Sequence, residues 1–259
     1  MAWRYATTFV LPTAITGSTD QPEHPVTNVG LTTGLLTRPR RTYWTDNITG
    51  EKVIDFDFGS AKVIAIVQID NTNAATIELR GGASPAPATV VLASLAVPYD
   101  AEVKHGRGRF APVAFNYRYL RIALQTAISG ATYYEVGTVA CIAAPTTAAT
   151  NYGSPFASLP IDPRLDSPYP GGGFETTSAG PKFWRLGPMV GGLEGGRWRR
   201  EAATDLAALR ALRIGDPWWF DRNDGDASHA YLVKLTQEIS KADAGPQGFE
   251  APVVFEEFT

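Results

Sequence analysis

The sequence predicts a mainly β protein whose first part is a sandwich of two packed sheets. Residues 53–79 give the clearest signal. Apolar and polar residues alternate over 53–58, as in a half-buried strand, and 63–69 is a nearly unbroken β-branched run, as in a fully buried strand. A half-exposed strand beside a buried one is typical of two stacked sheets. The composition agrees, because 25 glycines and 19 prolines among 259 residues mark many turns.

The charge and hydropathy of the chain exclude several classes of function. The net charge is −3 and only 19% of the residues are charged, whereas general nucleic-acid binding requires a basic face. No apolar run approaches the roughly 20 residues that span a bilayer, and the N-terminus shows no apolar signal segment. We therefore expect no nucleic-acid partner, no membrane insertion and synthesis in a reducing cytoplasm.

Residues 1–143 are expected to form the β-sandwich. A turn is expected at 59–61, and an Asn-rich loop at 70–73 separates the buried run from the next alternating segment. Periodicity and β-branched content predict the strands, which are expected at 53–58, 63–69, 76–79, 90–95, 111–115, 117–124 and 133–143.

The rest of the chain has a different character. Residues 144–182 are rich in proline and glycine and are expected to be a linker, or an arm that packs on a neighbouring subunit. Residues 183–259 are expected to be a smaller, β-rich α+β assembly domain. Its one helix is predicted over 201–214, where apolar residues recur at steps of three and Gly215 provides the stop. Strands are predicted there at 218–220, 231–235 and 253–258.

The residue types that carry catalysis are sparse. Cys141 lies in an apolar run and is expected to be a small buried residue, without a disulfide or a zinc cluster. The three histidines, His24, His105 and His229, are far apart in the sequence. A G-x-S-x-G nucleophile motif is missing as well. We therefore expect a protein that is not an enzyme.

The acidic segment 221–226 resembles a calcium loop only superficially. An EF-hand loop has glycine at its sixth position and glutamate at its twelfth. Here Gly225 is fifth and Leu232 is twelfth, so the segment is expected to be a polar hairpin turn. The sequence therefore predicts no metal site and no cofactor.

Two loops and one aromatic residue are the candidates for a binding site. The Asn-rich loop supplies amide groups, the segment 104–109 supplies basic groups, and a tryptophan near the start offers a flat apolar surface. Each has an ordinary alternative, since a basic segment is usually a solvated loop tip and a tryptophan in a β protein is usually core. The candidate binding residues are Trp44, Asn71, Asn73, His105 and Arg107.

Several short motifs of the first 143 residues resemble the galactose-binding-like (discoidin, F5/8 type C) jelly roll. The order of these pieces matches the family's strands, and the resemblance implies a jelly-roll β-sandwich. The segment 28–31 lacks the carboxylates of the family's structural calcium loop. The motifs are Ile15-Thr16-Gly17-Ser18, Thr42-Tyr43-Trp44, Ile54-Asp55-Phe56-Asp57-Phe58-Gly59, Tyr117-Arg118-Tyr119-Leu120-Arg121-Ile122 and Glu135-Val136-Gly137.

The chain also resembles minor tail or distal tail (baseplate) proteins of tailed bacteriophages. The resemblance lies in the segment 58–81, which contains F-G-S-A-K and N-T-N, and in L-R-I-G-D-P-W-W-F-D at 212–221. It implies a structural virion protein of the tail tip, made in the host cytoplasm, that assembles with copies of itself and with other tail proteins. Its loops would be presented to neighbouring proteins or to the host surface.

Two alternatives stand beside that role. One is a carbohydrate-binding module that recognises a glycan on the host surface through the candidate residues. The other is a hydrolase that degrades a surface polymer, which requires two carboxylates in one cleft. The candidate acids Asp100, Glu102 and Asp221 are scattered along the sequence.

Overall fold

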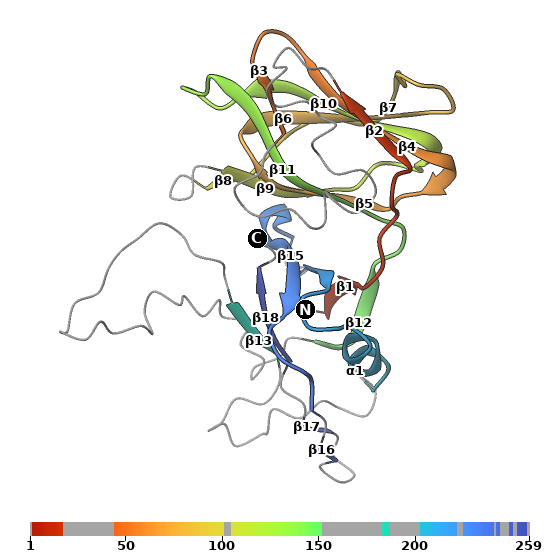
Figure 1. The fold of residues 1–259 in the computed structure, drawn as a ribbon, viewed down its shortest axis with the longest axis vertical. Coiled ribbons are helices and arrows are strands. Elements are labelled where there is room, and N and C mark those ends of the chain that lie inside the picture. The colour runs from red at the N-terminus through yellow and green to blue at the C-terminus, as the bar shows by residue number, and fades with distance from the viewer. Residues whose placement is uncertain are drawn as a thin grey trace, which may run out of the picture. The chain divides into compact units, whose positions relative to one another are not determined.

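A computed structural model describes residues 2–17, 44–100, 105–151, 183–186, 203–221, 225–240, 242–243, 249–250 and 253–257. Strands dominate these residues, together with one α-helix (Figure 1). The predicted mainly β class is confirmed. No helix among the described residues has both the length and the apolar character needed to cross a membrane. The chain divides into two compact units.

The larger unit is a β-sandwich made of Thr8–Pro145 together with Asp226–Ala230. Its two sheets have five strands each, and all the pairings between neighbouring strands are antiparallel. The first sheet has the order β2 (Ala14–Gly17), β4 (Lys52–Val63), β10 (Asn116–Ala127), β6 (Ala74–Gly82) and β7 (Thr89–Ala96). The second has the order β3 (Trp44–Asn47), β11 (Tyr133–Ile142), β5 (Ile66–Thr72), β9 (His105–Phe110) and β8 (Tyr99–Asp100).

Apolar side chains from both sheets fill the space between them. The alternation predicted for 53–58 is seen in β4, where every second residue from Lys52 to Phe58 is buried. The β-branched run becomes β5, in which six of the seven residues are buried. Cys141 also lies in this core, as predicted. The two periodicities therefore predicted the sandwich correctly, because each follows from how many faces of a strand are covered.

One detail of the first sheet differs from the expected one. The turn predicted at 59–61 is wrong, because β4 continues through these residues to Val63. Gly59 adopts a φ of 74°, and the pairing of β4 with β10 is irregular opposite this stretch. A glycine in this conformation allows a bulge that bends a strand without ending it. The chain leaves the sheet at Ile64 and Ala65 instead.

The strand predicted at 111–115 is also wrong. Residues 111–115 form a turn, and the neighbouring segment that was expected to be a basic loop forms β9. Gly106 lies against the side chain of Val97, which a Cβ atom on the glycine would approach to 2.8 Å. The glycines that suggested a loop are therefore explained by close packing within a sheet.

The smaller unit contains residues from both ends of the chain. Its six-stranded sheet has the order β12 (Thr146–Asn151), β1 (Ala2–Ala6), β14 (Pro217–Asp221), β15 (Ala230–Leu235), β18 (Val253–Glu257) and β13 (Phe183–Leu186). A short strand pair is formed by β16 (Ala242–Asp243) and β17 (Phe249–Glu250). The three strands predicted for this part of the chain are confirmed as β14, β15 and β18.

Helix α1 (Ala203–Arg210) and the aromatic residues of the sheet form the core of the smaller unit. The helix is shorter than predicted, since a turn follows Arg210 and Gly215 has a φ of 88°; residues 201–202 lie outside the described residues. Trp218 is fully buried. Tyr5 donates a 2.8 Å hydrogen bond to the buried carboxylate of Asp205 at the start of the helix.

The path of the chain differs from the expected division at residues 143 and 182. β1 pairs with β12 and with β14, so the first residues belong to the smaller unit and not to the sandwich. β12 lies within the segment that was expected to be a linker, and residues 152–182 lie outside the described residues. Tyr5 and Thr146 are opposite each other in the sheet. The sandwich is therefore inserted in sequence between two strands that hydrogen-bond to each other.

Candidate binding site at one end of the sandwich

Several connections of the sandwich meet at one of its ends, which we call the loop end (residues 47–51, 71–75, 97–100 and 128–133). The pairing fixes this arrangement. Lys52 at the start of β4 lies opposite Leu124, and Ala74 at the start of β6 lies opposite Ala127 at the end of β10. The chain enters and leaves the sandwich at the other end. There, the Val10 N–H donates to the main-chain oxygen of Cys141 over 2.8 Å.

The side chain of Asn73 is held at the loop end by two hydrogen bonds to the main chain. Its Nδ2 donates to the main-chain oxygen of Tyr133 over 2.6 Å, and its Oδ1 accepts from the N–H of Glu135 over 2.7 Å. The neighbouring Thr72 hydroxyl donates to the Glu135 oxygen over 2.7 Å. Asn73 is buried and its amide is used within the fold. It therefore positions the corner between β5 and β6 and is not free to contact a ligand in this conformation.

Asn71 lies at the same corner and is partly exposed. Its φ of 55° places it in the left-handed region, which asparagine tolerates better than most residues other than glycine. The backbone of this residue thus turns away from the strand direction as β5 ends. Of the two asparagines predicted for the site, this is the one whose side chain is available.

Two exposed tyrosines that the sequence analysis missed belong to the loop end. Tyr133 at the start of β11 is 46% exposed, and Tyr99 in β8 is 42% exposed. The exposure of Tyr133 follows from the alternation of a strand. Tyr134 is almost fully buried, and successive side chains of a strand point to opposite faces. Tyr99 is in a two-residue strand, too short for such a pattern.

The other predicted residues have different positions. Arg107 lies in β9, largely buried, with its Nε 3.5 Å from a carboxylate oxygen of Asp70. Trp44 begins β3 opposite Val136, and His105 begins β9 opposite Asp100; the placement of these two side chains is outside what the structure describes. Asn71 and Asn73 are thus brought together at the corner, whereas Arg107 serves an ion pair within the sheet.

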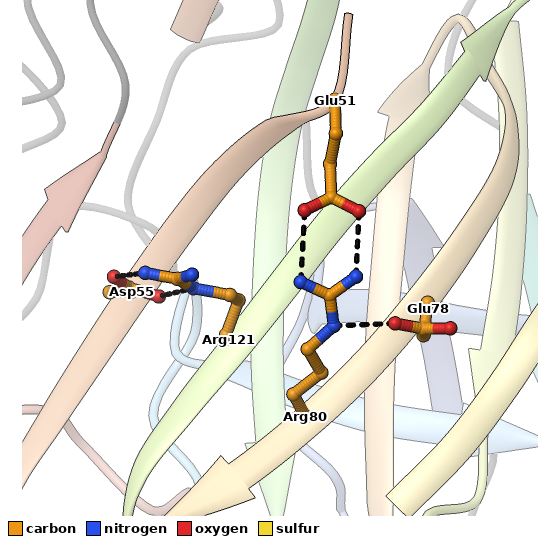
Figure 2. A network of polar contacts seen from close by, with 5 residues as sticks. All are labelled: Glu51, Asp55, Glu78, Arg80 and Arg121. Carbon is orange, nitrogen blue, oxygen red and sulfur yellow. Dashed lines mark hydrogen bonds and ion pairs between the residues drawn. The ribbon is translucent and has the colours of Figure 1, made fainter. Parts of the chain in front are cut away.

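The outward face of the first sheet carries a row of ion pairs (Figure 2). Arg121 of β10 binds both carboxylate oxygens of Asp55 over 2.7 and 2.6 Å. Arg80 of β6 binds Glu51 through two hydrogen bonds and Glu78 through a third. Both arginines of this network are bonded to carboxylates, and the three carboxylates exceed the arginines by one charge, so the network offers no unpaired cation to an anionic ligand.

A further pair on this sheet joins Asp57 and Arg118 through two 2.8 Å hydrogen bonds. The Arg118 guanidinium holds the pKa of Asp57 down at about 2, and the hydrogen bond from the Gly59 N–H acts in the same direction. This carboxylate is therefore ionised at neutral pH and is not suited to act as a general acid.

The described residues offer little for catalysis. Burial raises the pKa of the Cys141 thiol to about 12, so it is not a nucleophile at neutral pH. Among the residues that the structure describes, no group of three or more His, Cys, Asp and Glu side chains is placed to hold a metal ion. Of the acids considered for hydrolysis, Asp221 is fully buried and bonded to Arg4 within the smaller unit.

Comparison with known proteins finds likeness in structure alone. No protein-family model matches the chain, and no curated protein matches its sequence. One similar solved structure is the CBM32 of AlyQ in complex with 4,5-unsaturated mannuronic acid, with 23% identity, 53% of this chain and 99% of that chain covered, and a TM-score of 0.39.

Other similar structures have different roles. XRCC1 bound to the DNA pol beta catalytic domain has 17% identity, covers 53% of this chain and 99% of that chain, and has a TM-score of 0.42. A fucolectin from Morone saxatilis (striped bass) serum has 11% identity, covers 56% of this chain and 49% of that chain, and has a TM-score of 0.39. These scores are too low to assign a ligand to this chain.

The fold itself defines the class of protein. The chain is mainly β, and its larger unit is a jelly-roll β-sandwich, the architecture that the sequence predicted.

Proposed function

We propose that the sandwich is a carbohydrate-binding module whose loop end contacts a glycan. The observation that carries the proposal is the link between the Asn71 corner and Tyr133. Asn73 holds both, through its bonds to the main chain at Tyr133 and Glu135. An exposed aromatic ring and a partly exposed amide are thereby held at the same end of the sandwich.

This arrangement suits sugar chemistry. The apolar face of a sugar ring packs on an aromatic ring, while its hydroxyl groups take hydrogen bonds from amides and main-chain groups. The support matters as much as the contacts, because a loop that is already ordered loses little conformational entropy when it binds. The proposed activity is binding alone, with no bond broken, so the protein acts without a catalytic centre.

A printed glycan array probed with the full chain tests the proposal. The wild-type protein should bind a subset of glycans, and Tyr133→Ala and Asn71→Gly should each weaken that binding by about tenfold or more. Asn71→Gly is chosen because glycine accepts the positive φ while removing the amide. The matched control is Val113→Ala, which truncates a side chain that is 75% exposed in the turn before β10. Absence of binding by the wild type, or equal losses in the control, would contradict the proposal.

A second candidate is a structural role in a bacteriophage tail tip, where copies of the chain would assemble with one another and with other tail proteins. The observation that favours it is β7, the longest edge strand of the described sheets, which carries no charged residue. Uncharged edge strands pair readily with strands of another chain. A stable monomer at high concentration, measured by light scattering, would count against self-assembly. Electron microscopy of antibody-labelled phage particles would test the location in the virion.

A further inference from the structure

The two exposed tyrosines lie on opposite sides of the loop end. Strand pairing places them in the second sheet. Tyr99 is opposite Gly106 of β9, Gly106 is opposite Thr72 of β5, and Thr72 is opposite Val136 of β11. Tyr133 lies on that same strand β11, three residues nearer its start. The corner at Asn71 therefore lies between the two residues along the paired strands. Tyr99 shares a face of the sheet with Val136, whereas Tyr133, three residues from Val136, is on the opposite face.

The separation of the two tyrosines follows from the geometry of a sheet. Three strand spacings correspond to about 14 Å across the strands, and three residues correspond to about 10 Å along β11. Tyr133 and Tyr99 are thus too far apart for both rings to stack on one sugar. An occupant that uses both must extend over several sugar rings.

The charged groups near the corner indicate what kind of glycan this is. Arg107 is paired with Asp70, and Glu51 is paired with Arg80. A glycan with carboxylate or sulfate groups is normally bound by arginine or lysine side chains that can turn to it. The described arginines at this end already have carboxylate partners, so the surface matches an uncharged ligand.

We propose that the loop end binds an extended, neutral oligosaccharide, with one sugar ring on Tyr133, another on Tyr99 and the intervening part passing around the end of the second sheet at the Asn71 corner. This inference rests on the proposed carbohydrate binding and specifies the length and the charge of the ligand. The affinity should therefore rise with the number of rings until the ligand reaches from one tyrosine to the other.

Titration calorimetry on the full chain tests this with neutral oligomers of glucose, galactose, mannose and N-acetylglucosamine, from single sugars to about six rings, a length chosen to exceed the span between the tyrosines. For the series that binds, Tyr99→Ala should lower the affinity for the longest oligomer by about tenfold, which corresponds to about 1.4 kcal/mol. It should leave the affinity for the shortest binding oligomer unchanged. Tyr99→Phe retains the ring and should bind as the wild type does, and thermal unfolding checks that each variant is folded.

The outcomes separate this inference from the proposed function. A single sugar that binds as tightly as the longest oligomer, or an array on which anionic glycans alone bind, would overturn the inference and leave carbohydrate binding intact. Failure of every neutral and anionic glycan to bind would overturn both. Affinity that rises with length but is unaffected by Tyr99→Ala would overturn the role of Tyr99.

Discussion

Asn73 and Tyr133 are joined by a 2.6 Å hydrogen bond across 60 positions of the sequence. The bond runs from the side-chain amide of a buried residue to the main chain of an exposed one. It makes the conformation of the corner and the position of the exposed ring depend on each other. Four predictions concern this link and the sandwich that supports it.

Replacing Asn73 with alanine should destabilise the sandwich. The substitution leaves the Tyr133 oxygen and the Glu135 N–H without their side-chain partner, which costs about 1–3 kcal/mol for buried polar groups. Urea unfolding followed by far-UV circular dichroism measures the change in the free energy of unfolding. Glycan affinity should fall in the same variant although Asn73 does not touch the ligand. An unchanged free energy of unfolding would show that the link is unimportant.

Asn71 should tolerate glycine but not valine. The residue has a φ of 55°, and a left-handed conformation costs an ordinary L-residue about 1–2 kcal/mol, more for a β-branched one. Asn71→Val should therefore lower the free energy of unfolding by at least that amount, whereas Asn71→Gly should leave it nearly unchanged. The same urea experiment compares the two variants. Equal free energies of unfolding would contradict the left-handed conformation of Asn71.

The ion pair between Asp57 and Arg118 should make the stability of the sandwich sensitive to acid. The pKa of Asp57 is lowered from 3.8 to about 2 by its bonds to Arg118, so the unfolded chain binds the proton more readily than the folded one. The pair's contribution is complete above about pH 4 and is lost as the pH falls toward about 2. It should be small, since the pair is partly exposed and solvent screens it.

Two variants test this acid effect. Asp57→Asn removes the titrating group, and Arg118→Gln removes the cation that lowers its pKa. Both should flatten the dependence of unfolding free energy on pH between about 4 and 2, and Asp57→Asn should do so more completely, because the Gly59 N–H still lowers the pKa of Asp57 when Arg118 is replaced. A wild type and variants with parallel pH profiles would contradict the coupling.

Cys141 should resist thiol reagents in the folded protein. It is buried in the sandwich core, and burial raises the pKa of its thiol to about 12. Reaction requires both access and the thiolate, so modification by a disulfide reagent at neutral pH should occur only through unfolding. The rate should therefore rise with urea as the unfolded population rises. Immediate reaction in buffer alone would contradict the core position.

The fold was largely predictable because its signals are local. The alternation at 53–58 and the β-branched run at 63–69 report how many faces of each strand are covered, and both became strands of the sandwich. A local pattern of residues does not show which strands pair with each other. β1 and β12 belong to the smaller unit because they pair with each other and with β14, a contact that no local pattern reveals.

Two glycines account for the wrong predictions of a turn at 59–61 and of a loop at 104–109. Gly59 permits a bulge within β4, and Gly106 allows close packing inside the second sheet. In both cases the sequence suggested a turn or loop, since the residue that permits a turn also permits a close approach.

The candidate site was predicted in part. The Asn-rich loop was correctly placed between two strands, but sequence alone could not distinguish the roles of its two asparagines. Asn73 is buried because its amide matches main-chain groups of β11, whereas Asn71 is partly exposed. The positions of Tyr99 and Tyr133 depend on the pairing of four strands, and this pairing is a property of the assembled sheet.

Hydrogen–deuterium exchange of the full chain, with and without a bound neutral oligosaccharide, tests the central claim most directly. Glycan binding at the loop end predicts slower exchange in residues 71–75 and 128–133. Exchange in residues 83–88 and 111–115, in turns at the other end of the sandwich, should be unchanged. Protection confined to those turns or to the smaller unit, with the loop end unaffected, would contradict the account.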